Sequence, residues 1–252
     1  MKGMYLVMTS FVLKIIAMIT MFCDHLGDAI YRSVSPFNYI GRIAFPIFAF
    51  QISEGFLHTK NLKKYFIRLM AFALISQIPY ILFLSLYSNA VRLNIFFTLT
   101  LGLIAIWLHS YIHKDISTKI DSKIKNSIPN TLLKLVVEFI PVAAICVIGE
   151  LSKVDYGWWG ILLVFMFYYF KNNKLAMNIG FITMCIIYYG IDIIQTGFNT
   201  VYIWLFAFNV LPILFINLYN GKQGKKIKYL LYIFYPAHLL VLYLLFNFVF
   251  VV

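Results

Sequence analysis

The run Asp24-His25-Leu26-Gly27-Asp28 places three ionisable side chains inside an apolar stretch near the N-terminus. Such groups are costly in apolar surroundings, and they usually mark function. His25 and Asp28 are three residues apart, so on a helix they share a face and Asp28 could hydrogen-bond the imidazole. Asp24 is rotated by about 100° from His25 and is expected to meet another helix. This cluster favours chemistry at His25, although a single histidine can also serve only to join two helices.

A second set of polar residues follows in the next apolar stretch. Arg42 lies in the run Gly41-Arg42-Ile43-Ala44-Phe45-Pro46, at a depth near that of Asp24. An ion pair between Arg42 and Asp24 is the natural way to bury both charges. Glu54 and His58 are one turn apart, near the opposite end of the same stretch.

The last apolar stretch contains the run Phe234-Tyr235-Pro236-Ala237-His238. A proline there frees backbone groups and kinks the helix, a feature found where a cavity is lined. With these stretches placed across a membrane, as the composition below requires, Tyr235 and His238 are expected in the cytoplasmic half of the last stretch. His25 is expected beyond the membrane midplane, toward the outside.

The composition shows which elements must position these residues. The chain has 252 residues, of which 62% are hydrophobic and 12% charged, whereas a soluble domain is about half apolar and a quarter charged. So much apolar surface requires lipid. The net charge of +12 would suggest nucleic acid in a soluble protein. Because the basic residues sit in short clusters between apolar runs, they indicate topology instead, and no nucleic-acid partner is expected.

The pattern predicts an all-α, polytopic integral membrane helix bundle with about nine transmembrane helices, forming a single domain over residues 1–252. A span needs roughly 17–25 mostly apolar residues. The expected spans are Val7–Ile30, Phe37–Leu57, Tyr65–Leu84, Leu93–Ile112, Leu132–Leu151, Tyr156–Phe170, Leu175–Gln195, Thr200–Tyr219 and Tyr229–Phe250. The sixth is short.

The distribution of basic residues predicts the orientation. With these spans, 17 of the 21 Lys and Arg residues fall on one side, and only Arg32, Arg42, Arg92 and Lys153 fall on the other. Lys and Arg favour the cytoplasmic side. We therefore expect the N-terminus inside and the C-terminus outside.

The three cysteines, Cys23, Cys146 and Cys185, are widely separated within apolar runs. They are expected to be small buried residues, and no metal-ligand spacing is present. No metal site is predicted.

Several runs resemble the TraX family in the same order over nearly the whole chain. The specific ones are Asp24-His25-Leu26-Gly27 and Ile40-Gly41-Arg42-Ile43-Ala44-Phe45-Pro46. Weaker matches are Leu13-Lys14-Ile15-Ile16-Ala17, Glu54-Gly55-Phe56, Asn61-Leu62-Lys63-Lys64-Tyr65, Ser76-Gln77-Ile78-Pro79-Tyr80, Asn94-Ile95-Phe96-Phe97-Thr98-Leu99, Asp155-Tyr156-Gly157 and Tyr235-Pro236-Ala237-His238.

The resemblance implies a transmembrane acyltransferase of the bacterial cytoplasmic (inner) membrane. Its donor would be cytoplasmic acetyl-CoA, and its acceptor an amine or hydroxyl of a peptide, lipoprotein or glycan at the membrane or beyond it. Membrane lipid would be its other partner.

Acyl transfer needs a base and an oxyanion donor. His25 is the expected base, and Asp24 would hold its tautomer or pair with Arg42. Arg42, Asn94 or Tyr235 would stabilise the oxyanion or position the thioester. The expected pocket residues are Glu54, His58, Asn94, Tyr235, His238, Asp155 and Tyr156, and the residues expected to attract the CoA phosphates are Lys63, Lys64 and Arg68.

A rival class is a proton- or cation-coupled transporter. In that case Asp24, His25, Glu54 and His238 would form a relay. The absence of an inverted repeat and the odd number of spans weigh against transport. A third class, a subunit of a secretion assembly, leaves the polar cluster unexplained.

Overall fold

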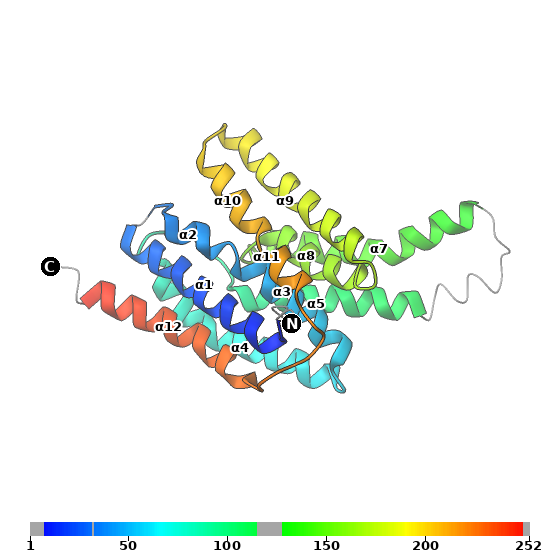
Figure 1. Ribbon diagram of the computed structural model, residues 1–252, viewed down its shortest axis with the longest axis horizontal. Helices are drawn as coiled ribbons and strands as arrows, with labels where there is room; N and C mark the ends of the chain where they lie inside the picture. The colour runs from blue at the N-terminus through cyan, green and yellow to red at the C-terminus, as the bar shows by residue number, and fades with distance from the viewer. Residues whose placement is uncertain (1–7, 32, 115–127, 249–252) are drawn as a thin grey trace, which may run out of the picture.

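The computed structural model describes residues 8–31, 33–114 and 128–248, and within these ranges every regular element is a helix (Figure 1). The helices are α1 (Ser10–Tyr31), α2 (Pro36–Gly41), α3 (Ala44–His58), α4 (Leu62–Leu84), α5 (Ile95–Ile112), α7 (Ile128–Leu151), α8 (Gly157–Tyr169), α9 (Lys174–Thr196), α10 (Val201–Val210), α11 (Pro212–Asn217) and α12 (Lys228–Phe248). The predicted all-helical bundle is confirmed.

Seven helical segments of the described chain are long and apolar enough to cross a membrane, with α2 and α3 taken together as one of them. The sixth and eighth predicted spans are shorter apolar helices, Gly157–Tyr169 and Val201–Asn217. The protein is thus a multi-pass membrane protein in which seven of the nine predicted segments reach full length. The inside–outside orientation of the termini stays a prediction.

The second span is interrupted at the point where its charged residue lies. Helix α2 ends at Gly41 and α3 begins at Ala44, so Arg42 and Ile43 lie between them. Pro46 explains the break, because it has no N–H to donate to the carbonyl of Arg42 and its ring crowds that carbonyl. Within α3 itself, Pro46 falls in the first turn, where its missing N–H has no helical partner anyway.

Helix α8 forms the centre of one half of the bundle, in contact with α3, α5, α7 and α9. Its interior residues, such as Trp159, Leu163 and Phe167, are almost fully buried. Gly102 allows α5 to approach closely, since a Cβ added there would lie 2.7 Å from the Cβ of Val164 on α8. The short helix is therefore enclosed by longer ones.

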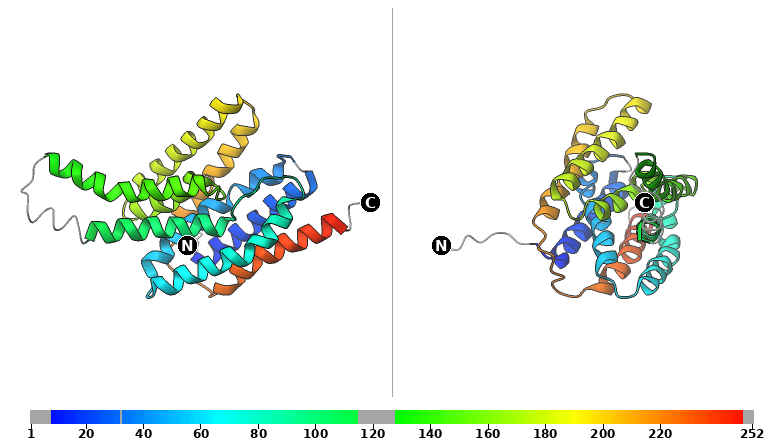
Figure 2. Two further views of the ribbon diagram at one scale, coloured as in Figure 1. Left: turned by 180° about the vertical axis from the view of Figure 1, so that it is seen from behind. Right: turned by 90° about the vertical axis from the view of Figure 1, so that its right-hand side faces the viewer.

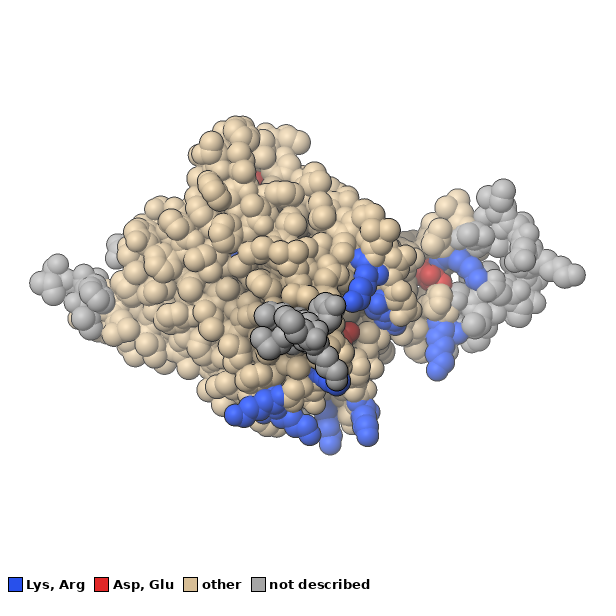
Figure 3. Space-filling view, viewed as in Figure 1, with Lys and Arg blue, Asp and Glu red and all other residues tan. Residues whose placement is uncertain are grey.

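The other half of the bundle contains α1, which packs against α2, α3 and α12, and α4, which packs against α12 and α5. Helices α9 and α10 form a hairpin that leans away from the body, and α5 and α7 extend together to one side (Figure 2). Figure 3 shows that Lys and Arg gather toward one end of this face, whereas the part over α1, α2 and α10 is almost free of them. Four of the basic residues that indicate topology on the predicted inner side (Lys2, Lys119, Lys123 and Lys125), and Arg32 on the outer side, lie outside the described residues.

Candidate functional site

The predicted ion pair between the first two spans is present. Nη2 of Arg42 lies 2.9 Å from each carboxylate oxygen of Asp24, and Nε of Arg42 donates to the backbone oxygen of Asn38 at 3.2 Å. Asp24 is buried. Gly41 permits this close approach of α1 and α2, because a Cβ at position 41 would collide with the side chain of Asp24.

Asn38 connects the two acidic residues of α1. Its Nδ2 donates to Asp24 Oδ1 at 3.1 Å and to Asp28 Oδ1 at 2.6 Å. Its Oδ1 accepts from both the backbone N–H and the hydroxyl of Ser35. The possible hydrogen bond between Asp28 and His25 is not formed, since Asp28 bonds to Asn38 and Nδ1 of His25 bonds to His238. Asn38 was not among the residues expected at the site, although its position in the first turn after Ser35-Pro36 is a sequence signal for its capping role.

His25 bonds instead to His238 of α12, with 2.7 Å between its Nδ1 and Nε2 of His238. Nδ1 of His238 lies 2.7 Å from the carbonyl oxygen of Phe234. A carbonyl only accepts, so His238 carries its proton on Nδ1, and its Nε2 in the neutral ring accepts from Nδ1–H of His25. Nε2 of a neutral His25 is then left with a lone pair. The contact also corrects the expected depths, which placed the two histidines in different halves of the membrane.

The side chains of His25, Asp24 and Arg42 line a cavity of about 400 Å³. Helices α1, α3, α4, α9 and α12 and the turns before α5 and α8 contribute to its wall. The predicted site residues that line it are Asp24, His25, Arg42, Asp155, Tyr156 and Tyr235. Asp28 of the predicted ionisable cluster also lines it, and the polar wall residues that were not predicted at the site are Tyr80, Tyr87, Ser88, Arg92 and Tyr188.

The turn between α7 and α8 brings Asp155 and Tyr156 to this cavity through an unusual backbone. Lys153 and Tyr156 have positive φ angles of 51° and 62°, which are rare for residues other than glycine and concentrate at functional sites. The ring of Tyr156 stacks on Phe45 with 4.0 Å between centroids, and the hydroxyl of Thr98 donates to the carbonyl of Asp155. Burial raises the pKa of the Asp155 carboxyl to about 6, against the opposing effect of Arg42 and Arg92.

Other predicted pocket residues lie elsewhere. Asn94 is buried at the start of α5, where its Oδ1 accepts from Phe96 N–H and its Nδ2 donates to Ala73 O and to Gln77 Oε1. Its Oδ1 therefore caps the start of α5, and both of its amide protons are already used. Asn94 is not one of the residues that line the cavity. Glu54 and His58 lie near the far end of α3, and Glu54 is about 18 Å along the helix axis from Arg42. The structure does not bring them to His25.

The residues expected to attract CoA phosphates lie on α4. Lys63 and Lys64 are exposed in its first turn. Arg68 donates to the hydroxyl of Tyr232 at 3.0 Å and lies over the ring of Tyr65. Tyr232 in turn packs on Phe96.

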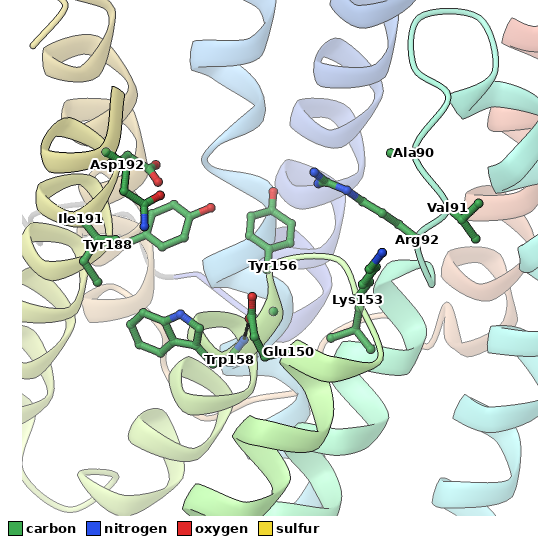
Figure 4. Close-up of a pocket in the computed structure, with 13 residues that line it drawn as sticks. Ala90, Val91, Arg92, Glu150, Lys153, Tyr156, Trp158, Tyr188, Ile191 and Asp192 are labelled. Atoms are coloured by element: carbon green, nitrogen blue, oxygen red, sulfur yellow. Dashed lines mark hydrogen bonds between the residues drawn. The ribbon is translucent and has the colours of Figure 1, made fainter. Parts of the chain in front are cut away.

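A second cavity of about 540 Å³ adjoins the first, because Arg92, Tyr156 and Tyr188 line both (Figure 4). We call it the vestibule. Its wall comes from the loop before α5, the turn between α7 and α8, the first turn of α8 and the last turns of α9. No group of three His, Cys, Asp or Glu side chains in the described part of the chain is placed to hold a metal ion.

Comparisons with known proteins agree with the resemblance of the sequence motifs. The family model described as TraX protein matches residues 10–246. A probable fimbrial assembly protein FimC, serogroup H1, from Dichelobacter nodosus is 28% identical over 253 residues, which cover 93% of this chain and 94% of that protein. No solved structure matches. Since the family model covers nearly the whole chain, from α1 to α12, this protein belongs to the TraX family.

Proposed function

We propose that this protein is an acyltransferase of the bacterial cytoplasmic membrane that moves an acetyl group from acetyl-CoA to an amine or hydroxyl acceptor. The observation that carries the proposal is the chain of hydrogen bonds from the Phe234 carbonyl through His238 to His25. It holds His25 in the tautomer with a lone pair on Nε2, beside a polar cavity large enough for a small acceptor group. A base that is oriented by a third group is typical of acyl transfer.

In the proposed reaction, Nε2 of His25 takes a proton from the acceptor as its nitrogen or oxygen attacks the thioester carbonyl carbon. The carbonyl oxygen becomes an oxyanion, then the C–S bond breaks and the CoA sulfur leaves with the proton held by His25. Arg42 is the best-placed oxyanion donor, because Nη1 donates to no protein group within the described residues. Tyr235 lines the same cavity and is the second candidate.

The donor is proposed to approach from the basic end of α4. Acetyl-CoA should raise the melting temperature of the purified full-length protein, and neutralising Lys63 and Lys64 to Gln should remove most of that rise, because exposed charges attract CoA phosphates in a salt-dependent way. The matched control is Lys171→Gln/Lys174→Gln, which removes two cations at the turn between α8 and α9. A thermal-shift titration with acetyl-CoA, CoA and a desthio analogue at two salt concentrations measures the effect.

Absence of any stabilisation at millimolar acetyl-CoA, in protein shown to be folded, would contradict the donor assignment. It would favour the transport alternative, which proton-flux measurements in vesicles then test. The structure supports only part of that alternative's relay, since His25 contacts His238 but Glu54 lies at the other end of α3.

His238 is proposed as a positioning residue for His25. Replacing His238 with Leu removes the acceptor for Nδ1–H of His25, so transfer should fall about tenfold to a hundredfold as the tautomer is lost. His238→Gln keeps an acceptor oxygen and should recover part of the rate. The pH profile of kcat/KM should change for the Leu variant but not for the Gln variant, and equal rates for both would contradict the role.

A further inference from the structure

The basic residues on the predicted outer side of the membrane are not scattered. Lys and Arg are disfavoured on that side, and the sequence places only four of its 21 there. Of these, Arg42 and Arg92 line the cavity beside His25, which we call the inner cavity because the vestibule adjoins it. Arg92 and Lys153 line the vestibule. Three of the four exceptions to the topological rule therefore face two adjoining cavities.

The backbone fixes Arg92 and Lys153 next to each other. Leu93 N–H donates to the Lys153 carbonyl at 3.1 Å, and Asp155 N–H donates to the Leu93 carbonyl at 2.8 Å. These two bonds form a short parallel bridge between the loop before α5 and the turn before α8. In Figure 4 both cationic side chains lie on one side of the vestibule, across from Asp192 and Tyr188.

These two cations are left available for a ligand. Neither has a carboxylate partner within 4.0 Å among the described residues. Glu150, the nearer acid in sequence, accepts instead from the backbone N–H of Trp158 at 3.3 Å, at the start of α8. Asp192 is the other acid of the wall.

We propose that the vestibule binds an anionic group of the acceptor, a carboxylate or a phosphate, through Arg92 and Lys153. The guanidinium of Arg matches the paired oxygens of both anions. Because Arg92 lines both cavities, an anion held there leaves the neighbouring amine or hydroxyl of the same molecule free to enter the inner cavity. Trp158 and Tyr188 supply apolar surface for the rest of the molecule. That the anionic group belongs to the acceptor rests on the proposed function, whereas binding of an anion in the vestibule does not depend on it.

The test measures binding without catalysis. The probes are sn-glycerol 3-phosphate and glycerol, titrated at constant ionic strength against the full-length protein in phosphatidylcholine nanodiscs, with thermal unfolding as the readout. Glycerol 3-phosphate should stabilise the wild type and glycerol should not. Arg92→Gln and Lys153→Asn, the latter chosen because Asn tolerates positive φ, should each raise the apparent Kd about tenfold.

Two controls separate this inference from the proposed function. His25→Ala should bind the anion as the wild type does even if it transfers nothing, and Lys171→Gln/Lys174→Gln should leave binding unchanged. Equal stabilisation by glycerol, or unchanged affinity in both vestibule variants, would overturn the inference. If one variant fails to fold, the other still decides the question.

Repeating the titration in nanodiscs that contain phosphatidylglycerol identifies the source of the anion. Competition by the lipid supports the same site with a lipid headgroup as its ligand. Unchanged affinity supports the site with a water-soluble or glycan-borne anion.

Discussion

Replacing His25 with alanine is expected to slow acyl transfer by about 100- to 10,000-fold, because a positioned general base contributes that much to a rate. The protein should still fold, since the change removes one hydrogen bond, to His238, and leaves the Asp24–Arg42 pair in place. Single-turnover transfer from radiolabelled acetyl-CoA to membrane acceptors measures the effect. His58→Ala is the matched control, because His58 is an exposed histidine at the far end of α3.

Rescue of the His25→Ala variant by free imidazole is a second test of the role of His25. The inner cavity holds about 400 Å³, so free imidazole has room to occupy the space that the missing ring vacates. Added imidazole should restore part of the rate of His25→Ala, and the rescue should follow the fraction of unprotonated imidazole. A His25→Ala protein that folds and keeps full activity would remove His25 from the mechanism.

Removing Arg42 is expected to have the largest effect on stability. Arg42→Ala leaves Asp24 as a buried charge without its partner, and breaking a buried ion pair in this way costs about 3–5 kcal/mol. Transfer should fall as well, because Arg42 is the proposed oxyanion donor. The melting temperature and the turnover of the same preparation measure the two effects separately.

A double substitution is the matched control for Arg42. Asp24→Asn/Arg42→Gln removes both charges, so it should be more stable than Arg42→Ala while remaining inactive. That combination of results separates the structural role of the ion pair from its catalytic role. An Arg42→Ala variant with normal acetyl-CoA binding and normal turnover would contradict the assignment.

Much of the bundle can be predicted from apolar run length alone, and depth along two spans was enough to predict the Asp24–Arg42 pair. The partner of His25 could not be predicted in this way, because His238 lies 213 residues away in the sequence. Helical spacing indicated that Asp28 shares a face with His25. It could not show that Asn38 of α2 donates a hydrogen bond to the Asp28 carboxylate.

The sequence was also ambiguous about polar residues at helix starts. Asn94 has the right type for an oxyanion donor, yet its side chain bonds to Ala73 and Gln77 within α4 and to the first turn of α5. A cap and a catalytic amide look the same in a sequence, because only the partners differ. Tyr87 and Arg92 reach the cavity from the connection between α4 and α5, and Tyr188 reaches it from α9. No spacing within one element predicts such convergence.

The length of α8 bears on how the membrane potential acts on this protein. Its 13 residues span about 20 Å, which is roughly 10 Å less than the hydrocarbon core of a bilayer. The vestibule lies over the first turn of α8. Water filling it would extend the aqueous phase inward and would concentrate the voltage drop over the remaining path to the basic helix ends. In the proposed reaction a neutral acetyl group would cross that path without electrical work, whereas moving one proton across the whole drop would involve about 2.3 kcal/mol per 100 mV. A short α8 would therefore leave the proposed acyl transfer insensitive to the membrane potential, whereas ion transport along the same path would depend on it.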